Sequence, residues 1–265
     1  MLTVAGRTDA GVHAIGQVAH TDVPTRSYAA LTTDRAGRSD PDRLLRRLGG
    51  VLPDDVRVTA VGPAPPGFDA RFSAVSRTYT YRLADSAWGA SPLRRRDTTP
   101  WRRRLDEHAM SEAAAALTGE HDFLAYCRPR EGATTVRSLR QLQVVRDNND
   151  VIVVTACADA FCHHMVRALV GALIAVGEQR RAVAWPAEVL ARAVRDSSVL
   201  VAPARGLTLT AVTYPEETLL AARAEQARQV RTLHAGPPRR YTDVSRVSRS
   251  GLPCPPAQHP ASPDS

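Results

Sequence analysis

A short carboxylate lies between two glycines near the start of the chain. Asp9 belongs to the segment Gly6-Arg7-Thr8-Asp9-Ala10-Gly11, with Arg7 two residues before it and His13 four residues after it. The glycines let the backbone turn tightly and hold the carboxylate out between two strands, where a ligand can reach it. For an isolated Asp-Ala-Gly an ordinary Asx-turn is the alternative. The neighbouring arginine and histidine favour a site at which Asp9 does chemistry.

Two other side chains could act with Asp9. Arg167 lies in an apolar, helix-like run, where a charge is costly unless it is paired; the alternative is a snorkelling or salt-bridged surface arginine. Tyr79 lies in an alternating, strand-like run with Tyr81 on the same face, so either ring could belong to the core. The residues alone do not distinguish Tyr79 from Tyr81 as the ring that meets a ligand.

The adjacent histidines His163 and His164 suggest a metal site. Neighbouring residues on a helix point about 100° apart, so the two imidazoles cannot easily share one ion. We therefore expect no metal, and we assign the pair to packing or to phosphate contact. This also disfavours a metal-dependent hydrolase built on the two histidines and Asp9.

Periodicity and turn residues predict the elements that position these side chains. The first unit, residues 1–66, is expected to have strands over 2–5, 16–20 and 56–61 and a helix over 41–48. A cluster of prolines and a glycine at 63–67 marks a domain boundary. In the second unit, residues 67–216, we expect a strand over 77–83, a helix over 105–117, a hairpin of 141–145 with 151–156, and a long helix over 161–176. Residues 217–265 form a polar, helix-prone stretch followed by a tail rich in Pro, Ser and Arg, expected to be disordered after about residue 235.

Composition limits the class of protein. The chain has 265 residues, 43% of them hydrophobic, and a net charge of +8 that suits a polyanion such as RNA. All 35 basic residues are Arg, which indicates a coding bias as much as a nucleic-acid partner. No run is long enough for a membrane span, so we expect a cytoplasmic protein. The four cysteines show neither a C-x-x-C pair nor zinc-ligand spacing, so we expect reduced thiols: Cys127, Cys157, Cys162 and Cys254.

Six sequence blocks together resemble the tRNA pseudouridine synthase A family. Ala5 to His20 is similar to the family's A-G-R-T-D-A-G-V-H block with its following Q-V-x-H. The others, in the family's order, are Phe68-Asp69-Ala70-Arg71-Phe72-Ser73-Ala74, Arg77-Thr78-Tyr79-Thr80-Tyr81, Gly119-Glu120-His121-Asp122-Phe123, Ala160-Phe161-Cys162-His163-His164-Met165-Val166-Arg167, and Ala202-Pro203-Ala204-Arg205-Gly206-Leu207 with Val212, Tyr214 and Pro215.

The resemblance implies a fold, a reaction and a site. The fold is α+β, the pseudouridine synthase fold, with two ferredoxin-like units forming a central, mostly antiparallel sheet flanked by helices. The reaction is the isomerisation of uridine to pseudouridine at positions 38 to 40 of the tRNA anticodon stem-loop, by a homodimer that needs no cofactor or metal. Asp9 is the implied nucleophile, Arg167 its charge partner and Tyr79 the ring that stacks on uracil. Base flipping and tRNA binding are assigned to Arg7, Phe68, Arg71 and Arg137.

The sequence departs from the family pattern at three places. Only four residues precede Ala5, where the family usually has a strand and a helix. A catalytically impaired, tRNA-binding remnant is therefore the alternative function. Asp69 replaces the usual His and must be neutralised by an arginine, and Ala168 stands where Asn is frequent.

Overall fold

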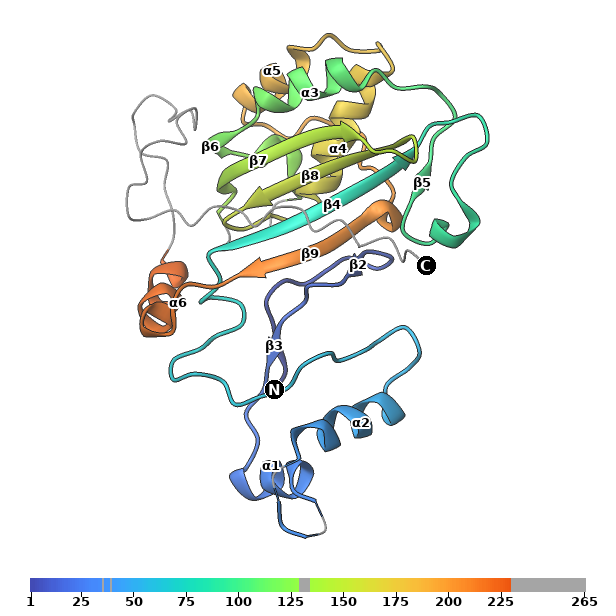
Figure 1. The fold of residues 1–265 in the computed structure, drawn as a ribbon. Coiled ribbons are helices and arrows are strands. Elements are labelled where there is room, and N and C mark those ends of the chain that lie inside the picture. The colour runs from blue at the N-terminus through green and yellow to red at the C-terminus, as the bar shows by residue number, and fades with distance from the viewer. Residues whose placement is uncertain (35, 39, 129–133, 230–265) are drawn as a thin grey trace.

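The computed structural model describes residues 1–34, 36–38, 40–128 and 134–229. Within these residues, seven strands form one sheet in the order β2-β9-β4-β8-β7-β6, with β5 beside β4 (Figure 1). The strands are β2 (His13–Ala14), β4 (Ser76–Ala84), β5 (Thr99–Pro100), β6 (Gly119–Asp122), β7 (Val136–Arg146), β8 (Val151–Ala158) and β9 (Leu207–Thr213). The β2–β9 and β4–β5 pairs are parallel and the other pairs are antiparallel. The expected α+β class with a mostly antiparallel central sheet is confirmed.

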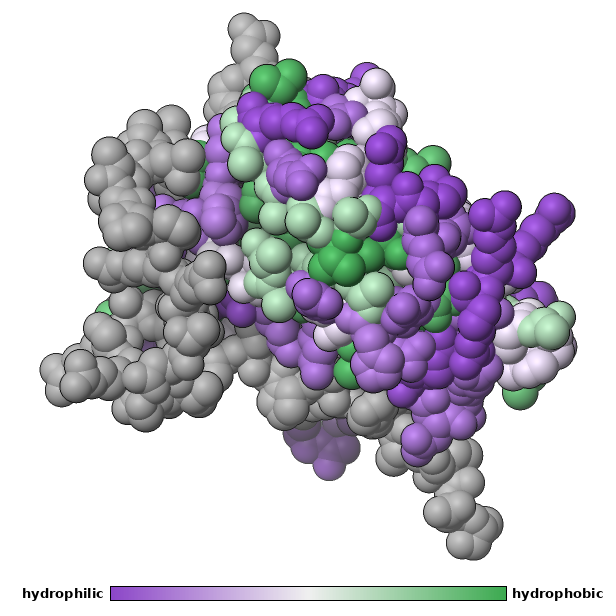
Figure 2. Space-filling view, turned by 90° about the horizontal axis from the view of Figure 1, so that it is seen from above, coloured by the Kyte–Doolittle hydropathy of each residue, from purple (hydrophilic) through white to green (hydrophobic). Residues whose placement is uncertain are grey.

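Three helices cover one face of this sheet: α3 (Glu107–Ala115), α4 (Met165–Gly177) and α5 (Trp185–Ala191). In α4, Arg167 is the one residue that is not buried, and the side chains of Leu169, Leu173 and Ile174 are fully buried. Burying a large apolar side chain contributes about 1.5–3 kcal/mol, so this stripe fixes α4 firmly on the sheet. Figure 2 shows the molecular surface from above, where hydrophilic residues surround a smaller patch of hydrophobic residues. No described helix is long and apolar enough to cross a lipid bilayer.

The N-terminal residues contribute to two sheets. Strands β1 (Thr3–Val4) and β3 (Ala19–His20) form an antiparallel ribbon, while β2, between them in sequence, pairs with β9 of the large sheet. Helices α1 (Thr25–Thr32) and α2 (Pro41–Val51) contact each other beyond the ribbon in Figure 1. The remaining helical segments are η1 (Pro92–Arg94), η2 (Leu124–Tyr126), η3 (Ala204–Gly206), η4 (Glu217–Leu219) and α6 (Leu220–Arg228). The ribbon and β2 together hold the segment that contains Asp9.

Several local expectations are confirmed and two are wrong. The predicted hairpin pairs β7 with β8 and sets Val145 opposite Val153, and the predicted helix at residue 41 is α2. Residues 56–61, in contrast, form no strand; Val56 and Val58 are exposed and pair with no strand among the described residues. The long helix starts at Met165 rather than at 161, since His164 before it adopts a left-handed backbone conformation with φ of 69°. The tail after residue 235 lies outside the described residues.

The expectation of reduced thiols is wrong for one pair of cysteines. Cys127 and Cys162 are joined by a disulfide, with their Cα atoms 5.7 Å apart and a sequence separation of 35. The backbone brings them together because the Arg128 N–H donates to the His163 carbonyl at 2.9 Å. This backbone contact is invisible in the spacing of the cysteines, which is why the sequence did not predict the pair.

A buried charge network ties the β7–β8 turn to α3. The carboxylate of Asp85 is fully buried and accepts hydrogen bonds from the Leu105 N–H at 2.8 Å and from Arg146 at 2.7 and 3.1 Å. Arg146 also donates to Glu107 at 3.0 Å. Burial by itself would raise the pKa of Asp85, but the hydrogen bonds from Arg146 and Leu105 hold it below its usual value. The ionised carboxylate is therefore part of the folded structure.

Asp85→Asn should destabilise the fold by about 3 kcal/mol at neutral pH, because it removes the fully buried carboxylate and leaves the partly buried Arg146 without its closest counter-charge. Chemical denaturation measures this loss. Because the folded-state pKa of Asp85 is depressed, its contribution is present above the unfolded pKa near 3.8 and is lost as pH falls through the folded value. The difference between wild type and variant should therefore shrink in acid.

The matched control is Asp54→Asn, which removes a fully exposed carboxylate that pairs with Arg57. This variant should unfold at nearly the wild-type denaturant concentration. An equal loss in both variants, or a loss for Asp85→Asn that is independent of pH, would contradict a specific role for the buried charge.

Candidate active site

A cavity of about 920 Å³ lies where the Asp9 loop meets β4 and the start of α4. It brings together three predicted site residues that are far apart in sequence, namely Asp9, Tyr79 and Arg167. Arg7, Arg71 and Arg137 also line it. Its size falls within the range usual for pockets that hold small ligands, so it has room for a single nucleotide.

The backbone around Asp9 is fixed on both sides. The Val12 N–H donates to the Asp9 carbonyl at 3.0 Å, which closes a turn in which Gly11 has a φ of 81°, favoured by glycine. Upstream, the Gln17 amide brackets Gly6, donating to its carbonyl at 2.7 Å and accepting from its N–H at 3.3 Å. These hydrogen bonds fix the backbone on either side of Asp9. The Asp9 side chain is 27% exposed, so its carboxylate remains open to the cavity.

Arg167 holds the carboxylate from the side of α4. Its Nη1 donates to Asp9 Oδ2 at 2.9 Å, and its Nε donates to the Ala202 carbonyl at 2.7 Å. The segment that carries this carbonyl lies directly on α4 at Gly171, where an added Cβ would fall 1.7 Å from the Leu200 carbonyl oxygen. Glycine at this position thus allows the approach that orients the guanidinium toward Asp9.

Both histidines also reach Asp9, contrary to the expected divergence of about 100°. His163 Nε2 lies 3.2 Å from Asp9 Oδ1, and His164 Nε2 lies 3.4 Å from Oδ2. The expectation assumed a regular helix, whereas the left-handed conformation of His164 places the two rings side by side, with centroids 3.9 Å apart. Burial, and then the neighbouring His163, lower the pKa of His164, while Asp9 acts in the opposite direction.

The two candidate tyrosines have different surroundings. Tyr79 lines the cavity, packs edge-to-face on Phe161 at 5.2 Å, and has its pKa raised to about 12 mainly by burial. Tyr81 is fully buried, and its hydroxyl donates to the Pro203 carbonyl at 2.8 Å and lies 2.9 Å from Thr99 Oγ1. Tyr81 is thus a core residue, and the Tyr79 hydroxyl is un-ionised at neutral pH.

The residues expected to contact tRNA are more dispersed. Arg7 and Arg71 are exposed at the cavity, and the Arg71 guanidinium lies 5.0 Å from the centre of the Phe72 ring. Arg137, the second residue of β7, donates to the carbonyls of Val136 and of Thr134 just before the strand. Phe68 is not among the lining residues and packs instead against Tyr214 and His20. Contacts of these four residues with tRNA stay predictions.

Sequence reasoning missed Arg77, a buried cation beneath the cavity. Its guanidinium donates to carbonyls of three separate segments: Asp159 at 2.8 Å, Ala5 at 3.1 Å, and Arg71. Burial lowers the pKa of Arg77, which shows the cost of placing a charge here. Arg77 is the first residue of the R-x-Y-x-Y block, but an arginine in a strand-like sequence carries no sign that its guanidinium is buried. Arg77 joins the strand before Asp9 to β4 and to the end of β8.

The negative charge of Asp69 is compensated in the structure. Asp69 accepts hydrogen bonds from the N–H groups of Arg71 and Phe72, and it pairs with Arg228 at 3.3 Å, so an arginine does neutralise it.

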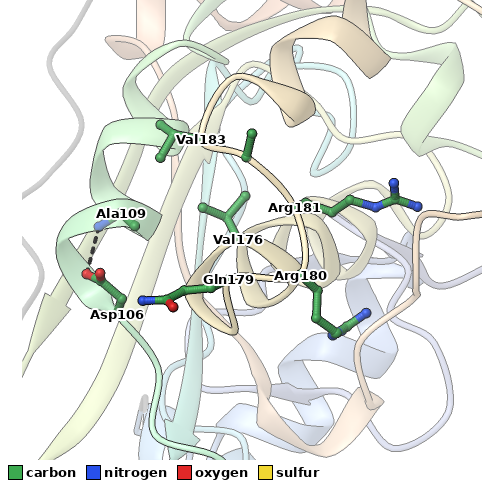
Figure 3. Close-up of a pocket in the computed structure, with 8 residues that line it drawn as sticks. Asp106, Ala109, Val176, Gln179, Arg180, Arg181 and Val183 are labelled. Atoms are coloured by element: carbon green, nitrogen blue, oxygen red, sulfur yellow. Dashed lines mark hydrogen bonds between the residues drawn. The ribbon is translucent and has the colours of Figure 1, made fainter.

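A smaller cavity of about 390 Å³ lies between α3 and the end of α4 (Figure 3). There Asp106 caps α3 by accepting a hydrogen bond from the Ala109 N–H. The side chains of Arg180 and Arg181 point away from Asp106. The described residues that line this cavity form no arrangement of groups suited to catalysis.

A carboxylate fixed by an arginine at the edge of a basic, nucleotide-sized cavity on an α+β sheet is an arrangement suited to an enzyme that acts on nucleic acid. The sequence profile of tRNA pseudouridine synthases matches residues 113–215. The chain is 59% identical over 230 residues to the tRNA pseudouridine synthase A of Frankia casuarinae, covering 87% of this chain and 80% of that protein. It is 56% identical to the Streptomyces griseus protein of that name (88% and 79% covered) and 47% identical to that of Mycobacterium leprae (87% and 81%). The chain belongs to the tRNA pseudouridine synthase family, whose members are isomerases.

Tyr79→Phe and Tyr81→Phe should separate a cavity role from a core role. Tyr81→Phe loses two buried hydrogen bonds and should lower the free energy of unfolding by about 1–2 kcal/mol, with little change in the rate of pseudouridine formation. Tyr79→Phe should unfold like the wild type, and Tyr79→Ala should lose most of the rate. Denaturation and single-turnover assays on tRNA measure the two effects. The assignment fails if Tyr81→Phe proves the more damaging to the rate.

Arg167→Ala should lower turnover about a hundredfold with a much smaller change in tRNA affinity. The variant removes a charge-assisted hydrogen bond to Asp9 that is worth up to about 3 kcal/mol. Arg103→Ala, which removes an exposed arginine, is the control and should leave turnover unchanged. Equal losses of turnover and affinity in Arg167→Ala would show that this arginine binds RNA and does not orient Asp9.

Proposed function

We propose that this chain converts uridine to pseudouridine at positions 38 to 40 of the tRNA anticodon stem-loop, with Asp9 as the nucleophile and without a cofactor. The observation that carries the proposal is the carboxylate of Asp9, bound to Arg167 at 2.9 Å and open to a cavity that Tyr79 also lines. The three positions in tRNA follow from the family resemblance of the Asp9 block.

The reaction requires little beyond these groups. The N-glycosidic bond of uridine breaks, the uracil rotates and a C-glycosidic bond forms, with no net gain or loss of atoms or electrons. A positioned carboxylate can attack C1′ of the sugar or the uracil ring, or remove a sugar proton. Arg167, which donates to Asp9 Oδ2 at 2.9 Å, orients the carboxylate in each case. The Tyr79 ring supplies a surface on which the uracil can stack, and its un-ionised hydroxyl can exchange hydrogen bonds with the base.

The charge of the cavity suits an RNA substrate. Among the residues that the structure describes, seven arginines and two carboxylates line it: Arg7, Arg71, Arg77, Arg128, Arg137, Arg167 and Arg223, with Asp9 and Asp159. Such an excess of positive charge attracts phosphates. A uridine in a stem reaches Asp9 only when it is flipped out of the stack, which costs a few kcal/mol. Arg7, which is exposed two residues before Asp9, would fill the vacated space.

The family resemblance also implies a homodimer that grips tRNA across a basic cleft. Arg71 and Arg137 would take part in this grip from the rim of the cavity. Sedimentation of the full chain with and without tRNA would test the stoichiometry.

The direct test uses Asp9→Asn and Asp9→Ala on a tRNA transcript with uridine at positions 38, 39 and 40. Both variants should bind the transcript and form no pseudouridine, since neither retains a nucleophilic carboxylate. Asp55→Asn, which changes an exposed aspartate, is the matched control and should keep full activity. Transcripts with cytidine at two of the three positions show which uridine is used.

The outcomes distinguish the candidate functions. Full activity in Asp9→Ala would refute the nucleophile, and pseudouridine only at other tRNA positions would refute the proposed target. A wild-type chain that binds tRNA and leaves every uridine unchanged would instead favour the alternative, a tRNA-binding protein with impaired catalysis.

A further inference from the structure

We propose that Asp9, His163 and His164 form a binding site for a divalent transition-metal ion of the Zn²⁺ class, and that a metal bound there inhibits the enzyme by occupying its carboxylate. The three side chains present one ligand atom each, and these atoms lie within 4.8 Å of one another. Two imidazole nitrogens and one carboxylate oxygen are a ligand set that Zn²⁺ prefers.

The spacing of the ligand atoms suits a tetrahedral ion. His163 Nε2 and Asp9 Oδ1 are 3.2 Å apart, and His164 Nε2 and Asp9 Oδ2 are 3.4 Å apart. In a tetrahedral shell with metal–ligand bonds of about 2.0 Å, neighbouring ligand atoms are about 3.3 Å apart. The two imidazoles face different oxygens of the same carboxylate, and one ligand atom from each residue can be chosen so that all three lie within 4.8 Å of one another. An ion would enter once side-chain movements bring these atoms to the tetrahedral spacing.

The backbone holds the two imidazoles in this arrangement before any ion enters. His164 takes a left-handed φ of 69°, which is uncommon for residues other than glycine, and α4 begins only at the next residue. The rings consequently lie 3.9 Å apart and both face the same carboxylate. The Arg128 N–H fixes the His163 carbonyl at 2.9 Å, which limits the movement of this segment. Little conformational entropy is then lost when a metal binds.

Three features of the site oppose a cation and limit its affinity. Arg167 places a positive charge 2.9 Å from Asp9 Oδ2, and the N-terminus of α4 adds the positive end of the helix dipole. Metal binding through Nε2 also leaves the proton on His163 Nδ1, which is buried and has no hydrogen-bond partner among the described residues. We therefore expect reversible binding, weaker than at a structural zinc site, and displacement by a chelator.

Inhibition follows from which group the metal occupies, and this part of the inference rests on the proposed function. A carboxylate oxygen bound to a metal ion donates its lone pair to the ion and is a poor nucleophile toward uridine. The ion also occupies the space next to Asp9 that a flipped base would enter. Metal and tRNA should therefore compete for the same site.

The test titrates the full-length protein with CoCl₂ and follows the visible absorption that tetrahedral Co²⁺ acquires with nitrogen and oxygen ligands. One equivalent should bind, and ZnCl₂ should displace it, since Zn²⁺ binds such sites more tightly than Co²⁺. Asp9→Asn, His163→Ala and His164→Ala should each weaken Co²⁺ binding about tenfold or more. His108→Ala, which removes an exposed histidine on α3, is the matched control and should bind like the wild type. Circular dichroism verifies that each variant is folded.

A second measurement connects binding to inhibition. ZnCl₂ should slow pseudouridine formation by the wild-type protein, EDTA should restore it, and excess tRNA should weaken Co²⁺ binding. If folded Asp9→Asn and His164→Ala bind Co²⁺ as the wild type does, the ion lies elsewhere and the site is refuted. Absence of the Co²⁺ spectrum in an active enzyme refutes the metal site alone. A chain that binds Co²⁺ through these residues but forms no pseudouridine refutes the proposed function and leaves the site intact.

Discussion

The ion pair between Asp9 and Arg167 is the interaction on which the cavity depends. It joins a turn near the start of the chain to a helix 158 residues later, and each partner is fixed by its own surroundings. Asp9 is held by the turn at Gly11, and Arg167 is held by the Ala202 carbonyl. A buried or half-buried pair is favourable only when its geometry is good, because both charges have given up water. The hydrogen bonds behind each partner supply that geometry.

Local periodicity explains why most of the second unit could be predicted. The apolar stripe of α4 and the hairpin around Asn148 and Asn149 are properties of neighbouring residues, and the structure confirms both. The segment 56–61 also has a strand-like sequence, yet Val56 and Val58 are exposed and unpaired within the described part of the chain. A strand needs a partner, which periodicity cannot supply. The start of α4 was misplaced for a different reason, since the left-handed conformation of His164 leaves no trace in hydrophobic spacing.

Site residues that belong to a sequence motif could be predicted. Contacts between residues far apart in the sequence could not. The Asp9 block and the helix with Arg167 were found, but only the family resemblance paired them. Tyr79 and Tyr81 look equivalent in sequence, and hydrogen bonds to Thr99 and Pro203 distinguish them in the structure. Cys127 and Cys162 illustrate the same limit, since a single backbone hydrogen bond between their neighbours brings them together.

One cation, Arg167, and two imidazoles, those of His163 and His164, contact the carboxylate of Asp9. Arg167 is its full counter-charge, and a second cation at equal distance would bind the oxygens more strongly and reduce their reactivity. Burial lowers the pKa of His164, so this imidazole stays neutral near pH 7 and contributes shape without charge. A neutral imidazole is also the form that binds metal ions. If Asp9 is the nucleophile, a neutral His164 leaves Arg167 as the charge partner of the carboxylate and keeps a nitrogen lone pair available to a transition-metal ion.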